Sequence, residues 1–274
     1  MRQRGNWVTR LVARARARTA PPLHIATDAG QGPVVILLHG IASSGATWEK
    51  LLPLVEPSRR TISIELLGFG ESPAPPNAEF TVEEHVAAID RTIRSLKLRE
   101  PFTLVGHSLG SLLAARYASM HHREVEHLVL VSPPVYLAPG EFGDPRVRVQ
   151  VSAYLKAYEF MRTNKDFTIA AATQMARLFA LGKTLEITEK NWTAFVLSLQ
   201  HCIESQTAIS DIASVHAPID VVYGAFDQFL APGSLKIIER MRGVTMHRIE
   251  VSDHVMRPRL ARAVAEVILG PTSG

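Results

Sequence analysis

Residues 106–110 read Gly106-His107-Ser108-Leu109-Gly110. An apolar run at residues 102–105 precedes it, and a helix-like stretch at residues 111–120 follows it. A sharp turn from strand to helix holds its serine in a strained backbone conformation. Glycine is needed on both sides because a Cβ there would collide with neighbouring backbone. Since such strain usually marks a functional site, the pentapeptide predicts Ser108 as a nucleophile.

The alternative interpretation is an ordinary glycine-rich turn with an incidental serine, because Gly-x-Ser-x-Gly also arises by chance. The context argues against it. The run before the turn is typical of a buried strand, and the apolar residues after it, such as Leu112 and Leu113, continue at helical density.

Length and composition favour one large α/β domain, since the chain has 274 residues of which 46% are hydrophobic and 20% are charged. The formal net charge is +4. Six arginines and no acidic residue lie in residues 1–20, which leaves 24 basic and 26 acidic residues in the remainder. The folded body therefore has no excess of positive charge for nucleic-acid binding.

Residues 1–20 form a basic N-terminal extension with too few apolar residues for a secretory signal. A frayed end is the favoured interpretation, and weak contact with a membrane surface is the alternative. Apolar runs elsewhere, such as residues 34–38, are far shorter than the roughly 20 residues that cross a bilayer. Cys202 is the single cysteine, which excludes an intrachain disulfide and a cysteine-rich metal site and suits a cytoplasmic location.

Strand-like and helix-like segments alternate through residues 21–135 and 216–274. Strands are predicted at residues 23–27, 34–38, 61–65, 102–105, 127–131, 219–223 and 246–251. Helices are predicted at residues 48–55, 82–96, 111–120, 233–241 and 258–269. The alternation predicts an α/β fold whose mainly parallel central sheet is covered by helices on both faces, with ligands beyond the carboxyl ends of the strands.

Residues 136–215 break this alternation, because they have helical periodicity without a convincing strand. We interpret them as a helical cap inserted into the core. Its large apolar residues are candidates for the lining of a substrate pocket: Tyr154, Tyr158, Met161, Met175, Phe179, Trp192 and Phe195. The alternative is that most of these side chains only pack on the core.

Further motifs accompany the pentapeptide in a fixed order. His39-Gly40 follows one predicted strand, and Gly68-Phe69-Gly70-Glu71-Ser72 follows the next. Gly224-Ala225-Phe226-Asp227 and Ser252-Asp253-His254 come late in the chain. With this set, residues 23–269 resemble the α/β-hydrolase superfamily, and in particular its serine hydrolases with a helical cap. The resemblance implies an α/β-hydrolase fold and a hydrolase that needs no metal and no cofactor.

The resemblance also implies a catalytic triad, with Ser108 as nucleophile, His254 as general base and acid, and Asp227 as the residue that orients the histidine. A serine hydroxyl is a weak nucleophile at neutral pH, so it needs a base, and the base needs an acidic partner. Asp253 is the other candidate acid. Because neighbours in sequence rarely face each other, we interpret Asp253 as a loop or capping residue.

An oxyanion hole is implied at the backbone N–H groups of Leu109 and Ile41, which occupy the family's positions for it. His39 and His107 lie beside the predicted site in sequence. We expect them to brace loops or line the pocket rather than act as bases.

The leading interpretation is a serine hydrolase, a carboxylesterase or a related acyl hydrolase, that acts on a small to medium apolar molecule. A carbon-carbon bond hydrolase or a perhydrolase would use the same triad, and fold analogy does not separate them. The alternative from another class is a receptor-like ligand-binding homologue with little turnover. Repeated turnover of short p-nitrophenyl esters distinguishes an enzyme from such a receptor.

Overall fold

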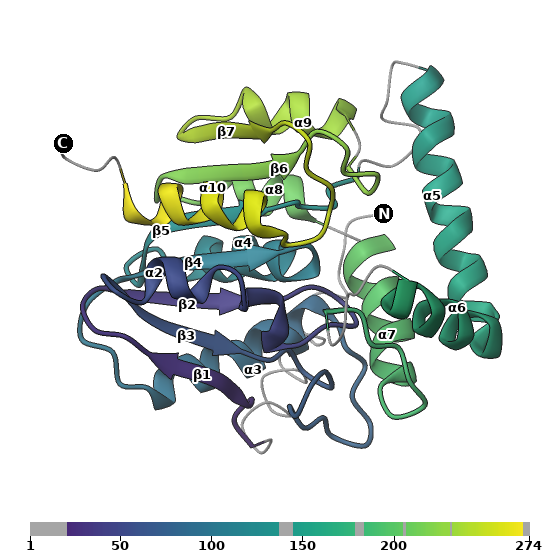
Figure 1. The fold of residues 1–274 in the computed structure, drawn as a ribbon, viewed down its shortest axis with the longest axis horizontal. Coiled ribbons are helices and arrows are strands. Elements are labelled where there is room, and N and C mark those ends of the chain that lie inside the picture. The colour runs from purple at the N-terminus through teal and green to yellow at the C-terminus, as the bar shows by residue number, and fades with distance from the viewer. Residues whose placement is uncertain (1–20, 137–144, 179–183, 205–206, 231, 271–274) are drawn as a thin grey trace, which may run out of the picture.

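The computed structural model describes residues 21–136, 145–178, 184–204, 207–230 and 232–270 (Figure 1). The basic extension at residues 1–20 and the candidate pocket residue Phe179 lie outside these ranges.

The fold is built on a seven-stranded sheet with the order β1-β3-β2-β4-β5-β6-β7. The strands are β1 (Ile25–Ala29), β2 (Val34–Leu38), β3 (Arg60–Ile64), β4 (Phe102–His107), β5 (Val125–Val131), β6 (Ile219–Gly224) and β7 (Val244–Ile249). Only the edge strand β1 is antiparallel to its neighbour β3, and the other pairs are parallel. The prediction of a mainly parallel central sheet is therefore confirmed.

Helices cover both faces of the sheet (Figure 1). On one face α3 (Val82–Ser95) and α4 (Leu109–Met120) bury a large core with alternate residues of the central strands, such as Ile36 and Leu38. On the other face α2 (Leu52–Val55) and α10 (Pro258–Leu269) pack against Val35 and Leu37. Successive side chains of a strand point to opposite faces, so the fully apolar strand β2 serves both cores. The remaining peripheral helix, α9 (Pro232–Glu239), packs beside β7.

The predicted helix at residues 48–55 is wrong in detail. The chain forms a 3₁₀ helix, η1 (Gly45–Trp48), and then the short α2. Pro53 stands in the first turn of α2, where its missing N–H is not needed, whereas it would break a helix that began at Trp48. The other elements differ from the prediction mainly at their ends.

A helical segment connects β5 to β6. It consists of α5 (Pro145–Thr163), α6 (Lys165–Leu178), α7 (Trp192–Ser198), the π-helical turn η4 (Leu199–Glu204) and α8 (Ala208–Ala213). Figure 1 shows α5, α6 and α7 gathered at one end of the sheet. The last helix, α8, packs on α4 instead, where Arg116 forms an ion pair with Asp211. The segment predicted as a cap, residues 136–215, thus includes one helix that belongs to the core.

The helical segment rests on loops that follow the carboxyl ends of the strands. The Glu186 N–H donates to the Ala42 carbonyl after β2, at 2.7 Å. The Tyr136 hydroxyl donates to the Phe229 carbonyl after β6, at 2.6 Å. The segment therefore lies over the edge of the sheet at which ligands bind in open α/β folds.

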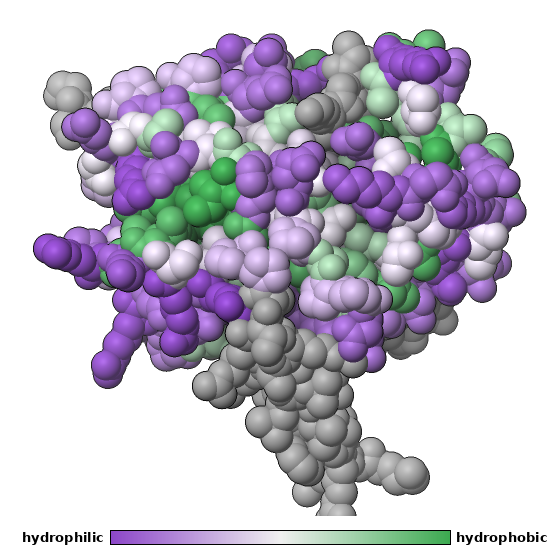
Figure 2. Space-filling model, turned by 90° about the horizontal axis from the view of Figure 1, so that it is seen from below, coloured by the Kyte–Doolittle hydropathy of each residue, from purple (hydrophilic) through white to green (hydrophobic). Residues whose placement is uncertain are grey.

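Figure 2 shows the face seen from below, where hydrophilic side chains surround a hydrophobic patch. Among the described residues, no helix is both long enough and apolar enough to cross a membrane.

Candidate active site

The turn between β4 and α4 has the strained geometry that the sequence predicts. Ser108 has φ 52° and ψ −121°, a backbone conformation that residues other than glycine rarely adopt. A Cβ added at Gly106 would lie 2.3 Å from the Gly110 carbonyl oxygen, and one added at Gly110 would lie 2.2 Å from the Leu38 carbonyl oxygen. Both glycines are therefore required by space, and they fix Ser108 at the start of α4.

Asp227 and His254 meet beyond the ends of β6 and β7. The His254 Nδ1 lies 2.9 Å and 2.8 Å from the two carboxylate oxygens of Asp227. An ionised carboxylate only accepts, so Nδ1 carries the proton and donates it to this pair of oxygens. The other ring nitrogen, Nε2, is then the unprotonated one in the neutral ring and is able to accept a proton.

Asp227 stays ionised although its side chain is fully buried. Burial raises the pKa of Asp227, but the hydrogen bonds and charge of His254, together with the other hydrogen bonds to the carboxylate, lower it by more, so the pKa lies below the ordinary value. The backbone N–H of Phe229 also donates to the carboxylate, at 3.0 Å. Phe229 contacts both partners, because its ring packs edge-on against the His254 ring with centroids 4.8 Å apart.

Asp253, the other candidate acid, faces away from the histidine next to it. Its carboxylate accepts from the Val255 N–H at 3.1 Å and from the Arg257 guanidinium at 3.1 Å. These are the contacts of a loop-capping residue, which is the interpretation favoured from the sequence.

His107 connects the turn to His254. Its Nε2–H donates to the backbone carbonyl of His254 at 2.8 Å, and the two rings lie 5.0 Å apart between centroids. Burial lowers the pKa of His107 to about 3, so its ring is neutral at physiological pH. Since His107 precedes Ser108 directly, this contact places His254 beside the turn. The Nδ1 atom of His107 is buried and has no hydrogen-bond partner among the described residues.

His39 is a buried brace and does not line a pocket. Its Nδ1–H donates to the Gly40 carbonyl at 2.7 Å, and its Nε2 accepts from the Leu66 N–H at 3.0 Å. Burial lowers the pKa of His39 to about 4, which keeps the ring neutral. With no exposed surface and both nitrogens bonded, it joins the loop after β2 to the loop after β3.

The two predicted oxyanion donors belong to backbone segments next to Ser108. Leu109 begins α4, where the first N–H groups of a helix have no partner within the helix. A Cβ added at Gly40 would lie 3.0 Å from the Ser108 Cβ, so the Gly40-Ile41 backbone passes directly against the serine. Within the described ranges, no hydrogen-bond partner is found for the N–H of Leu109 or of Ile41.

The candidate pocket residues differ in how far they are buried. Tyr158 and Phe195 are buried, and Tyr154, Met161 and Trp192 are half-buried against the same core. Met175, on α6, is 46% exposed. The helical periodicity from which these residues were chosen mainly reflects how the helical segment packs against the core.

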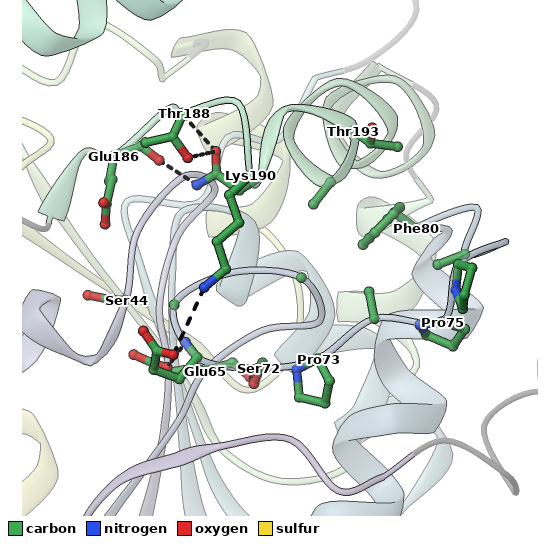
Figure 3. A pocket seen from close by; sticks show the side chains of 18 residues that line it. Ser44, Glu65, Ser72, Pro73, Pro75, Phe80, Glu186, Thr188, Lys190 and Thr193 are labelled. Atoms are coloured by element: carbon green, nitrogen blue, oxygen red, sulfur yellow. Dashed lines mark hydrogen bonds and ion pairs between the residues drawn. The ribbon is translucent and has the colours of Figure 1, made fainter.

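A cavity of about 460 Å³ lies between the loop after β3 and the segment that leads into α7 (Figure 3). Its lining includes Glu65, Phe80 and Glu186, and the ion pair between Lys190 and Glu71 also lines it. None of Ser108, Asp227 and His254 lines this cavity.

Glu65 had no predicted role, and the structure shows what it does. Its carboxylate accepts from the Gly45 N–H at 3.1 Å and the Glu71 N–H at 2.6 Å, and it pairs with the His24 ring at 2.9 Å. Glu65 thus connects the loops after β2 and β3. The sequence signal for this role is Gly68-Phe69-Gly70, which forms the tight turn held by Glu65. A Cβ added at Gly70 would lie 2.2 Å from the Glu65 Oε2.

Comparison with known proteins identifies the class. Residues 33–255 match the family described as the alpha/beta hydrolase fold, so the chain belongs to the α/β-hydrolase family. A solved thioesterase domain from the curacin biosynthetic pathway superposes with a TM-score of 0.64 and 24% identity, over 88% of this chain and 93% of that one. This likeness bears on the fold.

Two relatives are similar over part of the chain. A probable lysophospholipase of Arabidopsis thaliana, BODYGUARD 3, is 36% identical over 116 residues, which are 41% of this chain and 23% of that protein. The pimeloyl-[acyl-carrier protein] methyl ester esterase of Aeromonas hydrophila is 36% identical over 144 residues, 50% of this chain and 53% of that protein. The matched stretches thus span about a quarter and about half of these relatives.

Proposed function

We propose that this protein is a serine hydrolase that cleaves an ester or a related acyl compound through an acyl-enzyme, with Ser108, His254 and Asp227 as its triad. The observation that carries the proposal is the strained Ser108 at the start of α4, with the bonded His254–Asp227 pair placed beside it by His107. Strained serine, base and oriented acid together are the parts that acyl transfer requires.

In the first step, Ser108 Oγ attacks the carbonyl carbon of the substrate while His254 Nε2 takes the hydroxyl proton. The Asp227 carboxylate holds the ring in the tautomer whose Nε2 is free to accept, and its negative charge stabilises the imidazolium that forms. The carbonyl oxygen becomes an oxyanion. The N–H groups of Leu109 and Ile41 are the donors for it, because both flank the serine backbone.

The tetrahedral intermediate collapses when the bond from the carbonyl carbon to the leaving oxygen breaks and His254 gives its proton to that oxygen. The alcohol departs and the acyl group remains on Ser108. A water molecule then attacks the acyl-enzyme with His254 again as base, which releases the acid and restores the serine.

The proposed substrate is a small to medium molecule with an apolar acyl or alcohol group. Support comes from the names of the two relatives. One is named as an esterase and the other as a probable lysophospholipase, and both names describe the cleavage of ester bonds. In this proposal the helices from α5 to η4 form the cap. The half-buried side chains of Tyr154, Met161 and Trp192 are the best candidates for its apolar lining.

A fluorophosphonate probe tests the nucleophile. We expect one covalent adduct, mapped to Ser108 by peptide mass spectrometry and absent in Ser108→Ala. Ser119→Ala, on the same helix, is the control and should label like the unchanged protein. An adduct that persists in Ser108→Ala, or that maps to another serine, would show that the nucleophile is elsewhere.

Turnover on p-nitrophenyl butyrate separates the enzyme from a receptor-like protein. An enzyme releases many equivalents of p-nitrophenol per chain at a steady rate. A single equivalent followed by arrest would contradict the proposed hydrolysis of the acyl-enzyme while leaving Ser108 as the acylated residue.

A further inference from the structure

The outer side of α5 and α6 exposes apolar side chains at an unusual density. Ten large hydrophobic side chains are exposed among the described residues, and five of them lie on these two helices: Val149, Phe160, Phe167, Met175 and Leu178. Scattered exposed apolar residues are normal on a protein surface, but a cluster marks a surface that contacts something apolar.

Their spacing makes them one continuous surface. Val149 and Phe160 are eleven residues apart on α5, and Phe167 and Leu178 are eleven residues apart on α6. Eleven residues are close to three full turns, so each pair lies on one side of its helix. The Phe160 and Phe167 rings pack edge-to-face with centroids 5.4 Å apart, which joins the two sides at the corner between the helices. We call these four residues the outer stripe.

The charge around the outer stripe is positive. The two helices, residues 145–163 and 165–178, contain six basic and two acidic residues, whereas the rest of residues 21–274 contains 18 basic and 24 acidic residues. Lys156 is exposed on the same side of α5 as Val149 and Phe160, and Arg177 is exposed beside Leu178. Arg162 pairs with Glu204 and Lys165 with Glu189, so the six basic residues face four acidic ones and the two helices keep an excess of two positive charges (6 − 4).

We propose that the outer stripe docks on the surface of an anionic lipid bilayer. Two phenylalanines, a valine and a leucine supply the apolar insertion, and the flanking basic residues supply attraction to acidic headgroups, which is the combination that holds an amphipathic helix at a membrane surface. A second copy of the chain is a poorer occupant, because pairing two such faces would bring positive charge against positive charge.

A vesicle flotation assay tests the proposal. The protein is the full chain with Ser108→Ala, which prevents any turnover of lipid, and the vesicles contain phosphatidylcholine alone or phosphatidylcholine with phosphatidylserine. We expect the protein to float with the phosphatidylserine vesicles and to do so less as the salt concentration rises. In Phe160→Ser/Phe167→Ser the bound fraction should fall by about tenfold, because the centre of the apolar insertion is lost.

Two comparisons make the result specific. Leu54→Ser/Met120→Ser removes two exposed apolar side chains from other parts of the surface and should float like the parent. Lys156→Glu/Arg177→Glu should weaken flotation only with anionic vesicles. Circular dichroism of each variant shows whether the fold is kept.

Other outcomes would overturn the proposal. If Phe160→Ser/Phe167→Ser floats like the parent while deletion of residues 1–20 abolishes flotation, the basic extension alone binds the bilayer. If the parent is a dimer by light scattering, does not float, and becomes a monomer in Phe160→Ser/Phe167→Ser, the outer stripe is an interface between copies. Absence of flotation under all conditions also contradicts the proposal.

Discussion

The phenolic hydroxyl of Tyr136 donates a 2.6 Å hydrogen bond to the backbone carbonyl of Phe229. The same residue, Phe229, donates its N–H to Asp227 and packs its ring on His254. Tyr136 is in turn bonded to the Tyr158 hydroxyl of α5, at 2.9 Å. A chain of contacts therefore runs from the helical segment to the loop that holds the Asp227–His254 pair.

Tyr136→Phe is expected to lower kcat on a p-nitrophenyl ester by about tenfold with a smaller change in KM, because the loop around Asp227 loses an anchor while the substrate contacts stay. The partner of Tyr136 on α5, the Tyr158 hydroxyl, stays protonated at neutral pH because burial raises its pKa to about 12. The comparison is Tyr117→Phe, which removes another buried tyrosine hydrogen bond, a 2.6 Å bond to Glu124. Equal losses of kcat in the two variants would mean that the loss comes from lower stability of the fold and not from the position of the Asp227 loop.

Asp227→Asn is expected to reduce kcat by about 10⁴-fold while the fold is kept, because the amide favours the wrong tautomer of His254. Asp253→Asn should change kcat little, since its carboxylate bonds only to Val255 and Arg257 in the described structure. Steady-state kinetics of the two purified variants decide between the two acids. The reverse order of effects would assign the acid to Asp253.

Ser108→Gly is expected to abolish turnover and to raise the free energy of unfolding by about 1 kcal/mol. Glycine adopts φ 52° without the strain that a residue with a side chain has there. Gly106→Ala should do the opposite, because its new Cβ would lie 2.3 Å from the Gly110 carbonyl oxygen. Urea denaturation at pH 7.5 measures both. A destabilised Ser108→Gly would show that the serine conformation is not strained.

Acidification is expected to destabilise the fold between about pH 6.5 and pH 4. Burial lowers the pKa of His39 to about 4 and those of His85 and His107 to about 3, from 6.5. Below pH 6.5 these histidines bind protons in the unfolded chain but not in the folded chain. Their contribution to the free energy of unfolding is therefore complete above pH 6.5 and is lost as the pH falls. Each such histidine contributes a slope of up to about 1.4 kcal/mol per pH unit.

Urea denaturation at several pH values measures this slope. His85→Gln should reduce it by about one proton, because this buried ring of α3 stays neutral in the folded chain. A free energy of unfolding that is flat from pH 7 to pH 4.5 would contradict the neutral state assigned to these buried rings.

The parts of this molecule that were predicted from the sequence are those in which neighbours in the chain determine the geometry. Ser108 is strained because of Gly106 and Gly110, and the strand β2 was predicted at its observed bounds because all five of its residues are apolar. The place of Asp227 was predicted through the order of the family motifs.

Contacts between distant segments were not predicted. The Tyr136–Phe229 hydrogen bond joins residues 93 positions apart, and no local pattern marks either one. Periodicity also does not distinguish a side chain that faces a ligand from one that faces solvent. Met175 and Phe195 were both predicted as pocket residues because they are large and apolar, yet one is exposed and the other is buried.

The helical segment also has a consequence for synthesis of the chain, because it separates the parts of the site in time. His107, beside the serine, and its partner His254 are 147 positions apart, and the whole segment from α5 to α8 is made between them. During translation, the serine turn emerges from the ribosome well before the histidine. The nascent chain therefore contains Ser108 before His254, the base of the proposed triad, has been made.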